Sequence, residues 1–102
     1  MTKSNLNYII NELKIIANFI KKNDLANYHS SLINLYIYIY KLKGKKLEYI
    51  FILLLPKIAS LIKANAEVFE NKLELSRKVY IKKCLEVLEE LIKDCEIRKE
   101  LK

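Results

Sequence analysis

The stretch NLYIYIYKLKGKKLEYIFILLL, residues Asn34–Leu55, decides the fold, because it reads either as a β-hairpin or as two helices joined by a turn. Tyr and Ile alternate over Tyr36–Tyr40, as they would in a strand. Alternation indicates a strand only where it separates polar from apolar side chains, and here both sides would be apolar. We therefore predict a helix that begins after Asp24 and ends at Gly44. Its apolar residues recur in steps of three and four at Leu25, Tyr28, Leu32, Leu35, Ile39 and Leu42.

The same helical spacing extends to both sides of this stretch. A first helix is predicted from an N-cap at Ser4 to about Lys22–Asn23, with apolar residues at Leu6, Ile9, Leu13, Ile16 and Ile20. A third covers residues 46–66, with apolar residues at Leu47, Phe51, Leu54, Ile58 and Leu61, and Pro56 marks either a kink or the first turn of a new helix. From about Glu67 we expect one long helix or two collinear ones, with apolar residues at Ile81, Cys84, Leu88, Leu91 and Cys95.

These patterns predict an all-α fold, a bundle of about four helices in a single domain of residues 1–102. The composition agrees, because the 102 residues include one Gly and one Pro, too few breakers for the many turns of a sheet protein. A membrane span is not expected. The apolar run Tyr49–Leu55 is far shorter than the ~20 residues required, and Lys57 and Lys63 follow it.

Two segments of the chain resemble each other. Leu6, Tyr8 and Ile9 match residues 47, 49 and 50, and the segment IANFIKKN (16–23) matches IASLIKAN (58–65) after a slip of one residue in the interval that contains Pro56. A bulge or kink at Pro56 would absorb that slip. If the repeat is real, the molecule consists of two helix–helix motifs, residues 4–43 and 46–99, related by a pseudo-two-fold axis.

No motif in the chain points to catalysis. It contains one histidine, His29, and no recognised pattern for a metal, a nucleotide or a nucleophile, so we expect no catalytic, cofactor-binding or metal-binding residue and no enzymatic activity. Cys84 and Cys95 both fall on the apolar stripe of the last helix. They are expected to be buried free thiols in a reducing, cytoplasmic compartment, with an intermolecular disulfide as the alternative.

The net charge of +7 raises the possibility of nucleic-acid binding. The densest basic cluster is Lys41, Lys43, Lys45 and Lys46, and the second is Arg77, Lys78, Lys82 and Lys83. Lys outnumbers Arg 17 to 2, however, and bidentate contacts to phosphate and guanine are mainly made by Arg. Nucleic-acid binding is therefore the alternative function, and the other interpretation of both clusters is a solvated helix end.

Surplus apolar surface is the stronger functional signal. The two helices of the opening stretch are apolar around most of their circumference, more than one buried stripe requires. Either they form the centre of the fold, or some of their side chains contact a partner. We favour a non-enzymatic protein–protein interaction module that binds a peptide, a helix or a second copy of itself at the seam between the two motifs. The expected contact residues are Tyr36, Ile37, Tyr38, Tyr40, Tyr49 and Phe51.

The segments IANFIKKN, LYIYIYKLKGKK and VYIKKCLEVLEELIK share a usage of Ile, Lys, Tyr and Glu that resembles small orphan proteins of viruses of hyperthermophilic crenarchaea, filamentous viruses included. The length is similar as well. The resemblance covers the whole chain as style and length, without a diagnostic motif. It implies action in the cytoplasm of a host cell and a binding role rather than catalysis, and it carries no functional residue over.

Overall fold

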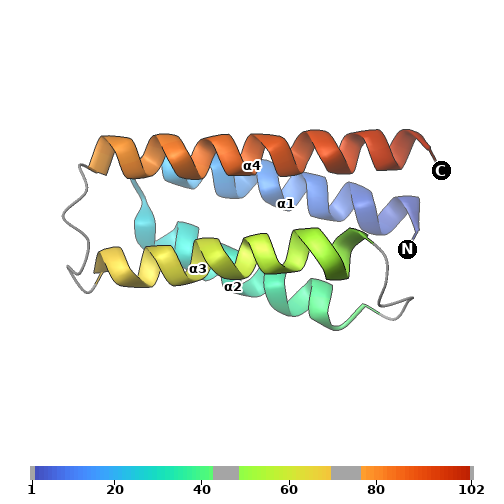
Figure 1. Ribbon diagram of the computed structural model, residues 1–102, viewed down its shortest axis with the longest axis horizontal. Helices are drawn as coiled ribbons and strands as arrows, with labels where there is room; N and C mark the ends of the chain where they lie inside the picture. Colours follow the sequence, from blue (N-terminus) through green and yellow to red (C-terminus); the bar gives the residue numbers. More distant parts are fainter. Residues whose placement is uncertain (1, 43–48, 70–76, 102) are drawn as a thin grey trace.

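The computed structural model describes residues 2–42, 49–69 and 77–101, and it contains four α-helices and one π-helical segment. Helix α1 is Lys3–Lys21, α2 is Leu25–Tyr40, η1 is Ile50–Leu54, α3 is Leu55–Phe69 and α4 is Arg77–Glu100. Successive helices run in opposite directions along one long axis (Figure 1). The predicted all-α bundle is therefore confirmed, and the alternating residues Tyr36–Tyr40 are helical.

Helix α1 buries the stripe that the sequence predicts, together with Ile10 and Ala17. Its predicted N-cap, Ser4, is wrong. The helix begins earlier, because the Thr2 hydroxyl oxygen accepts a hydrogen bond from the Asn5 backbone N–H at 3.1 Å. The helix ends at a C-cap on Lys22, as predicted, and Asn23 then adopts φ 59°, a left-handed conformation that Asn tolerates better than most residues.

Helix α2 begins as predicted, because the Asp24 carboxylate accepts a hydrogen bond from the Asn27 backbone N–H at 3.3 Å. All of the predicted stripe except Leu42 is fully buried, and Leu42 is half-buried against the core. The helix ends at Tyr40, with Lys41 as its C-cap. The predicted role of Gly44 concerns a residue outside the described ranges.

Pro56 occupies the first turn of α3, directly after the π-helical segment η1. A π-turn contains about one residue more than an α-turn. In the two similar segments, Ile9 and Ile16 of α1 are seven residues apart, whereas the matching Ile50 and Ile58 are eight apart, and η1 lies in this longer interval. The structure thus has a π-helical bulge where the sequence comparison requires an extra residue. The repeat itself stays a prediction.

The expected helix in the last part of the chain is present over Arg77–Glu100, but its expected start near Glu67, as one long helix or two collinear ones, is wrong. Residues 67–69 complete α3, and α4 begins at Arg77 and runs back antiparallel to α3 (Figure 1). The reversal lets α4 pack along α1, where Cys84, Leu88, Leu91 and Cys95 enter the core. Ile81 is only half-buried, and its neighbour Tyr80, which the stripe omitted, is buried instead.

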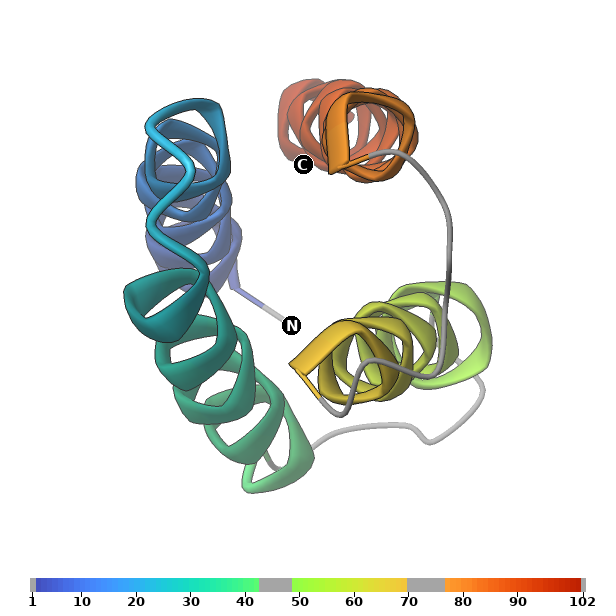
Figure 2. The ribbon, with the colours of Figure 1, turned by 90° about the vertical axis from the view of Figure 1, so that its left-hand side faces the viewer.

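Three neighbouring pairs of helices pack closely: α1 with α2, α1 with α4, and α2 with α3. The fourth pair, α3 and α4, is not among them, and the end-on view shows these two ribbons more widely separated than α1 and α2 (Figure 2). Among the described helices, none has the length and apolar character needed to cross a bilayer.

Candidate binding surfaces

Large apolar side chains are exposed mainly at one end of the bundle. This end holds the start of α1, the end of α2, η1 and the end of α4, which lie together on the right of Figure 1. We call the exposed apolar side chains there the apolar end, and two of them are largely exposed, Tyr40 at 68% and Leu101 at 81%. Only Ile15 and Val79 among the large exposed apolar side chains of the described residues lie elsewhere. The apolar end consists of Tyr8, Ile37, Tyr40, Ile52, Leu53, Ile97 and Leu101.

The predicted partner-binding residues all lie in or next to elements at this end, but those whose side chains are described do not share one face. Tyr36 and Tyr40 stack on each other along α2, with ring centroids 6.3 Å apart, and the side chain of Ile37 is exposed. Tyr38 and Tyr49 are half-buried and make contacts within the protein. Phe51 lies in η1, and its side chain is outside the described part of the structure.

Tyr38 is turned toward α1. Its hydroxyl donates a hydrogen bond to Asn5 Oδ1 at 3.2 Å, and its ring lies 4.3 Å from that of Tyr8, centroid to centroid. Partial burial raises the pKa of the Tyr38 hydroxyl, and the neighbouring Tyr8 adds to the effect. These contacts fix the end of α2 against the start of α1. Tyr38 therefore helps to position the apolar end, and the exposed Tyr8 forms part of it.

Tyr49 is turned toward α4. Its hydroxyl donates to Asp94 Oδ2 at 3.1 Å, and the guanidinium of Arg98 lies 3.9 Å from the ring centroid, a cation–π contact. Burial raises the pKa of the Tyr49 hydroxyl well above its usual value, reinforced by Cys95 and Asp94 and opposed by Arg98. The contact ties the segment before η1 to the last third of α4.

A groove of about 380 Å³ lies between α3 and α4, where the two helices are not closely packed. Its inner surface is apolar and comes from both helices, and charged side chains are confined to its margins. The sequence does not predict this groove, because the groove depends on the distance between α3 and α4, which no local pattern specifies. The inner surface is formed by Leu61, Ala64, Tyr80, Cys84 and Val87, and the exposed margin by Lys57, Ser60, Lys83 and Glu90.

Buried polar groups lie beside one end of the groove. The Tyr80 hydroxyl donates to Asn65 Oδ1 at 2.9 Å, and Asn65 is completely buried. Within the described residues, Asn65 Nδ2 has no hydrogen-bond partner. The Cys84 thiol neighbours the hydroxyls of Tyr80 and Tyr28, and burial raises the pKa of all three groups. A buried thiol with a raised pKa is protonated near neutral pH, so Cys84 behaves as a small packing side chain.

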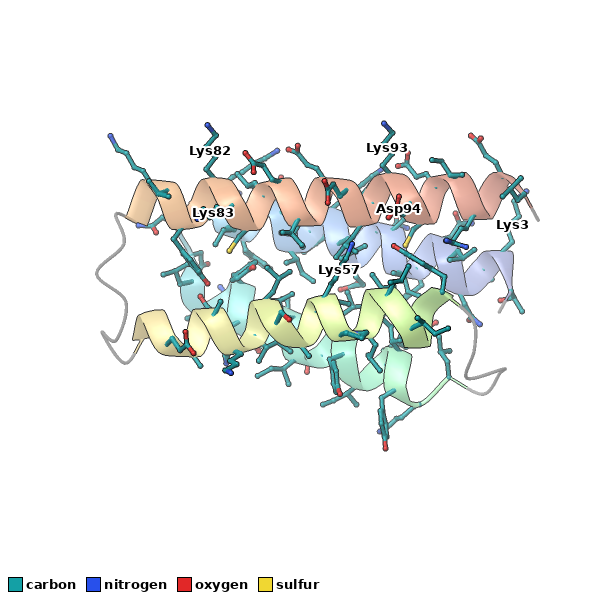
Figure 3. The ribbon with its side chains drawn as sticks, viewed as in Figure 1. Lys3, Lys57, Lys82, Lys83, Lys93 and Asp94 are labelled. Carbon is teal, nitrogen blue, oxygen red and sulfur yellow. The ribbon has the colours of Figure 1, made fainter. Side chains whose placement is uncertain are left out.

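The described lysines of the two basic clusters lie at opposite ends of the bundle, one after the end of α2 and the others at the start of α4 (Figure 1). Lys41 is exposed after α2, whereas Lys43, Lys45 and Lys46 fall outside the described residues. Lys78, Lys82 and Lys83 are exposed on the first two turns of α4, and the side chain of Arg77 is outside the description. Figure 3 shows Lys82 projecting away from the bundle, in a direction that Lys83 does not share. Acidic Glu86, Glu89 and Glu90 follow within the next two turns.

Both cysteines are free and buried, as the sequence predicts. The described residues contain no group of three or more His, Cys, Asp or Glu side chains suited to a metal ion. Comparisons of the chain with protein-family models, with curated proteins and with solved structures gave no match, so the resemblance to crenarchaeal virus proteins stays a prediction.

Proposed function

We propose that this protein is a non-enzymatic protein–protein interaction module, and that it binds a partner protein or a second copy of itself through the apolar end. One observation carries the proposal: exposed large apolar side chains gather at one end of a bundle that already has a buried apolar core. Scattered exposed hydrophobic residues are normal on a protein, whereas a cluster of them typically marks an interaction site.

The arrangement suits recognition of another protein. The exposed part of the apolar end includes aromatic rings, and Tyr is enriched at interfaces because its ring is apolar and its hydroxyl tolerates water. The contacts of Tyr38 with Asn5 and of Tyr49 with Asp94 hold three of the four contributing elements in place. A surface fixed in this way loses little conformational entropy on binding, which favours affinity.

Sedimentation velocity over a wide concentration range tests self-association, and affinity capture from the native source tests a different partner. Ile37→Asp should weaken either interaction by at least about 30-fold, the effect of losing an interfacial hot spot of ~2 kcal/mol. Val79→Asp is the matched control, since Val79 is similarly exposed at the start of α4 and far from the apolar end. A strictly monomeric protein that retains no partner contradicts the proposal, as does an equal effect of the two variants.

Nucleic-acid binding is the competing outcome of the same experiments. Affinity for DNA or RNA would fall steeply with salt, because bound lysines release counterions from the phosphates. Lys43→Glu/Lys45→Glu would abolish such binding, and Ile37→Asp would leave it unchanged. That pattern would replace the protein-binding proposal.

A further inference from the structure

Helix α2 has a second stripe of small and apolar side chains, on the side that faces away from the core. Its residues recur in steps of four and three, the spacing by which one helix packs along another. Ile33 is half-buried and the other members are exposed. Figure 2 shows α2 at a corner of the bundle, with no other described helix on its outer side. This outer stripe consists of Ala26, Ser30, Ile33, Ile37 and Tyr40.

We infer that the outer stripe binds the same stripe of a second copy of this chain, so that two α2 helices pack antiparallel about a two-fold axis at Ile33. The inference rests on the proposed function, because Ile37 and Tyr40 belong to the apolar end, and it names a second copy as the partner. In a two-fold symmetric pair only the residue on the axis meets its own equivalent, and every other residue of the stripe meets a different one.

The absence of charge on α2 favours a second copy. No Asp, Glu, Lys or Arg occurs in Leu25–Tyr40, although charged residues make up 30% of the chain. A net charge of +7 opposes the association of two copies wherever their lysines meet, and the outer stripe is free of that repulsion. A helix that is uncharged and largely apolar around its whole circumference is typical of one that is buried on all sides.

The sizes of the side chains fit an antiparallel pair. The stripe begins with the small residues Ala26 and Ser30 and ends with the large residues Ile37 and Tyr40. When the two helices run in opposite directions about Ile33, Ala26 of each copy lies opposite Tyr40 of the other, and Ser30 lies opposite Ile37. Large side chains then meet small ones along the seam, which permits close packing. A parallel pair would place Tyr40 against Tyr40 and leave a gap at Ala26.

The charges that flank α2 favour the same direction. Asp24 precedes the helix, and the exposed Lys41 follows it. Neither group forms an ion pair within the described part of the chain. The antiparallel arrangement brings Asp24 of each copy toward Lys41 of the other, so opposite charges meet at both ends of the seam. A parallel pair would bring like charges together instead.

The size of the contact sets its expected strength. The 16 residues of α2 span ~24 Å at 1.5 Å per residue, so a contact one helix wide, ~10 Å, covers ~240 Å² of each copy. Stable dimers bury about 800 Å² per copy. We therefore expect a weak and reversible dimer, with a dissociation constant above about 10 μM.

Sedimentation velocity at protein concentrations up to about 1 mM tests whether the dimer forms. Ser30→Glu, which places a charge within the seam, should weaken the dimer at least about tenfold. Ser4→Glu is the matched control, because it makes the same change at an exposed position of α1, and it should leave the dimer intact. A protein that stays monomeric at 1 mM overturns the inference. If that monomer still captures a different protein in a manner that depends on Ile37, the proposed function stands without it.

Cysteine cross-linking tests the direction of the pair. A mixture of Ala26→Cys and Tyr40→Cys should form a mixed disulfide under mild oxidation, and Ile33→Cys should cross-link to itself, because these positions lie opposite each other across the seam. The native thiols are buried and do not compete. Lys82→Cys is the control for chance collisions, since Lys82 projects away from the bundle (Figure 3), and it should stay monomeric. Self-linking of Ala26→Cys in place of the mixed disulfide indicates a parallel pair, which overturns the inference and leaves the proposed function standing.

Discussion

The buried hydrogen bond between Tyr80 and Asn65 is the contact whose removal has the most informative consequence. Tyr80→Phe deletes only the hydroxyl group that donates to Asn65 Oδ1 at 2.9 Å. Asn65 is 0% exposed, so water cannot replace the lost donor, and its Nδ2 already has no partner among the described residues. An unsatisfied buried polar group costs about 1–3 kcal/mol. We expect Tyr80→Phe to reduce the free energy of unfolding by about 1–2 kcal/mol.

The matching substitution on α3 should reverse this loss. Asn65→Leu removes the amide and its unpaired Nδ2 while keeping a side chain of similar size. In the double variant Tyr80→Phe/Asn65→Leu, neither partner of this hydrogen bond retains a buried polar group, and replacing both partners by apolar groups of similar shape is nearly neutral or stabilising. The double variant should therefore be at least as stable as the unmodified protein, within about 0.5 kcal/mol, and clearly more stable than Tyr80→Phe alone.

Urea unfolding followed by circular dichroism at 222 nm measures the free energy of unfolding of the unmodified protein, the two single variants and the double variant. Thermal unfolding provides a second readout, since ~1 kcal/mol shifts Tm by about 4–8 °C in a domain of this size. Tyr40→Phe is the control, because the largely exposed Tyr40 hydroxyl is hydrated and its loss should change stability by less than about 0.5 kcal/mol. Additive losses in the double variant, or a neutral Tyr80→Phe, would show that this hydrogen bond does not couple α3 to α4.

Two further predictions concern the helix start and the alkaline limit of stability. Thr2→Ala should reduce the free energy of unfolding by about 1 kcal/mol through loss of the N-cap, whereas Ser4→Ala should change it by less than about 0.5 kcal/mol. A larger effect of Ser4→Ala than of Thr2→Ala in urea unfolding would show that Ser4 is the N-cap. Burial, with a smaller contribution from Asp94, raises the pKa of Cys95 from its ordinary value of 9.0 to about 11, so the folded state retains this proton where the unfolded state has lost it. Stability should consequently fall as pH rises from about 9 to 11, by up to roughly 2–3 kcal/mol from this thiol, and Cys95→Ala should flatten that part of the profile; an unchanged slope would contradict the assignment.

Much of the secondary structure and of the core follows from local pattern. In α1 and α2 every residue of the predicted apolar stripe is buried except Leu42, because a 3.6-residue period places those side chains on one side of any helix they form, whatever packs against it. The same period predicts that the segment Tyr36–Tyr40, whose alternation resembles a strand, is helical. Two positions in this local pattern differ from prediction: the first helix is capped by Thr2 rather than Ser4, and Tyr80 rather than Ile81 is buried at the start of α4.

What the sequence determined by itself is thus the all-α class, the apolar faces of the helices and the burial of both cysteines, all of which depend on residues within a few turns of one another. Only the tertiary structure decided where α3 turns back into α4, which exposed side chains gather at one end, and that α3 and α4 stand apart to leave a groove. These features depend on the antiparallel register of segments far apart in the chain, such as Tyr49 beside Asp94 and Asn65 beside Tyr80. The spacing between two packed helices is set by the side chains of all their neighbours together, so no local periodicity encodes it.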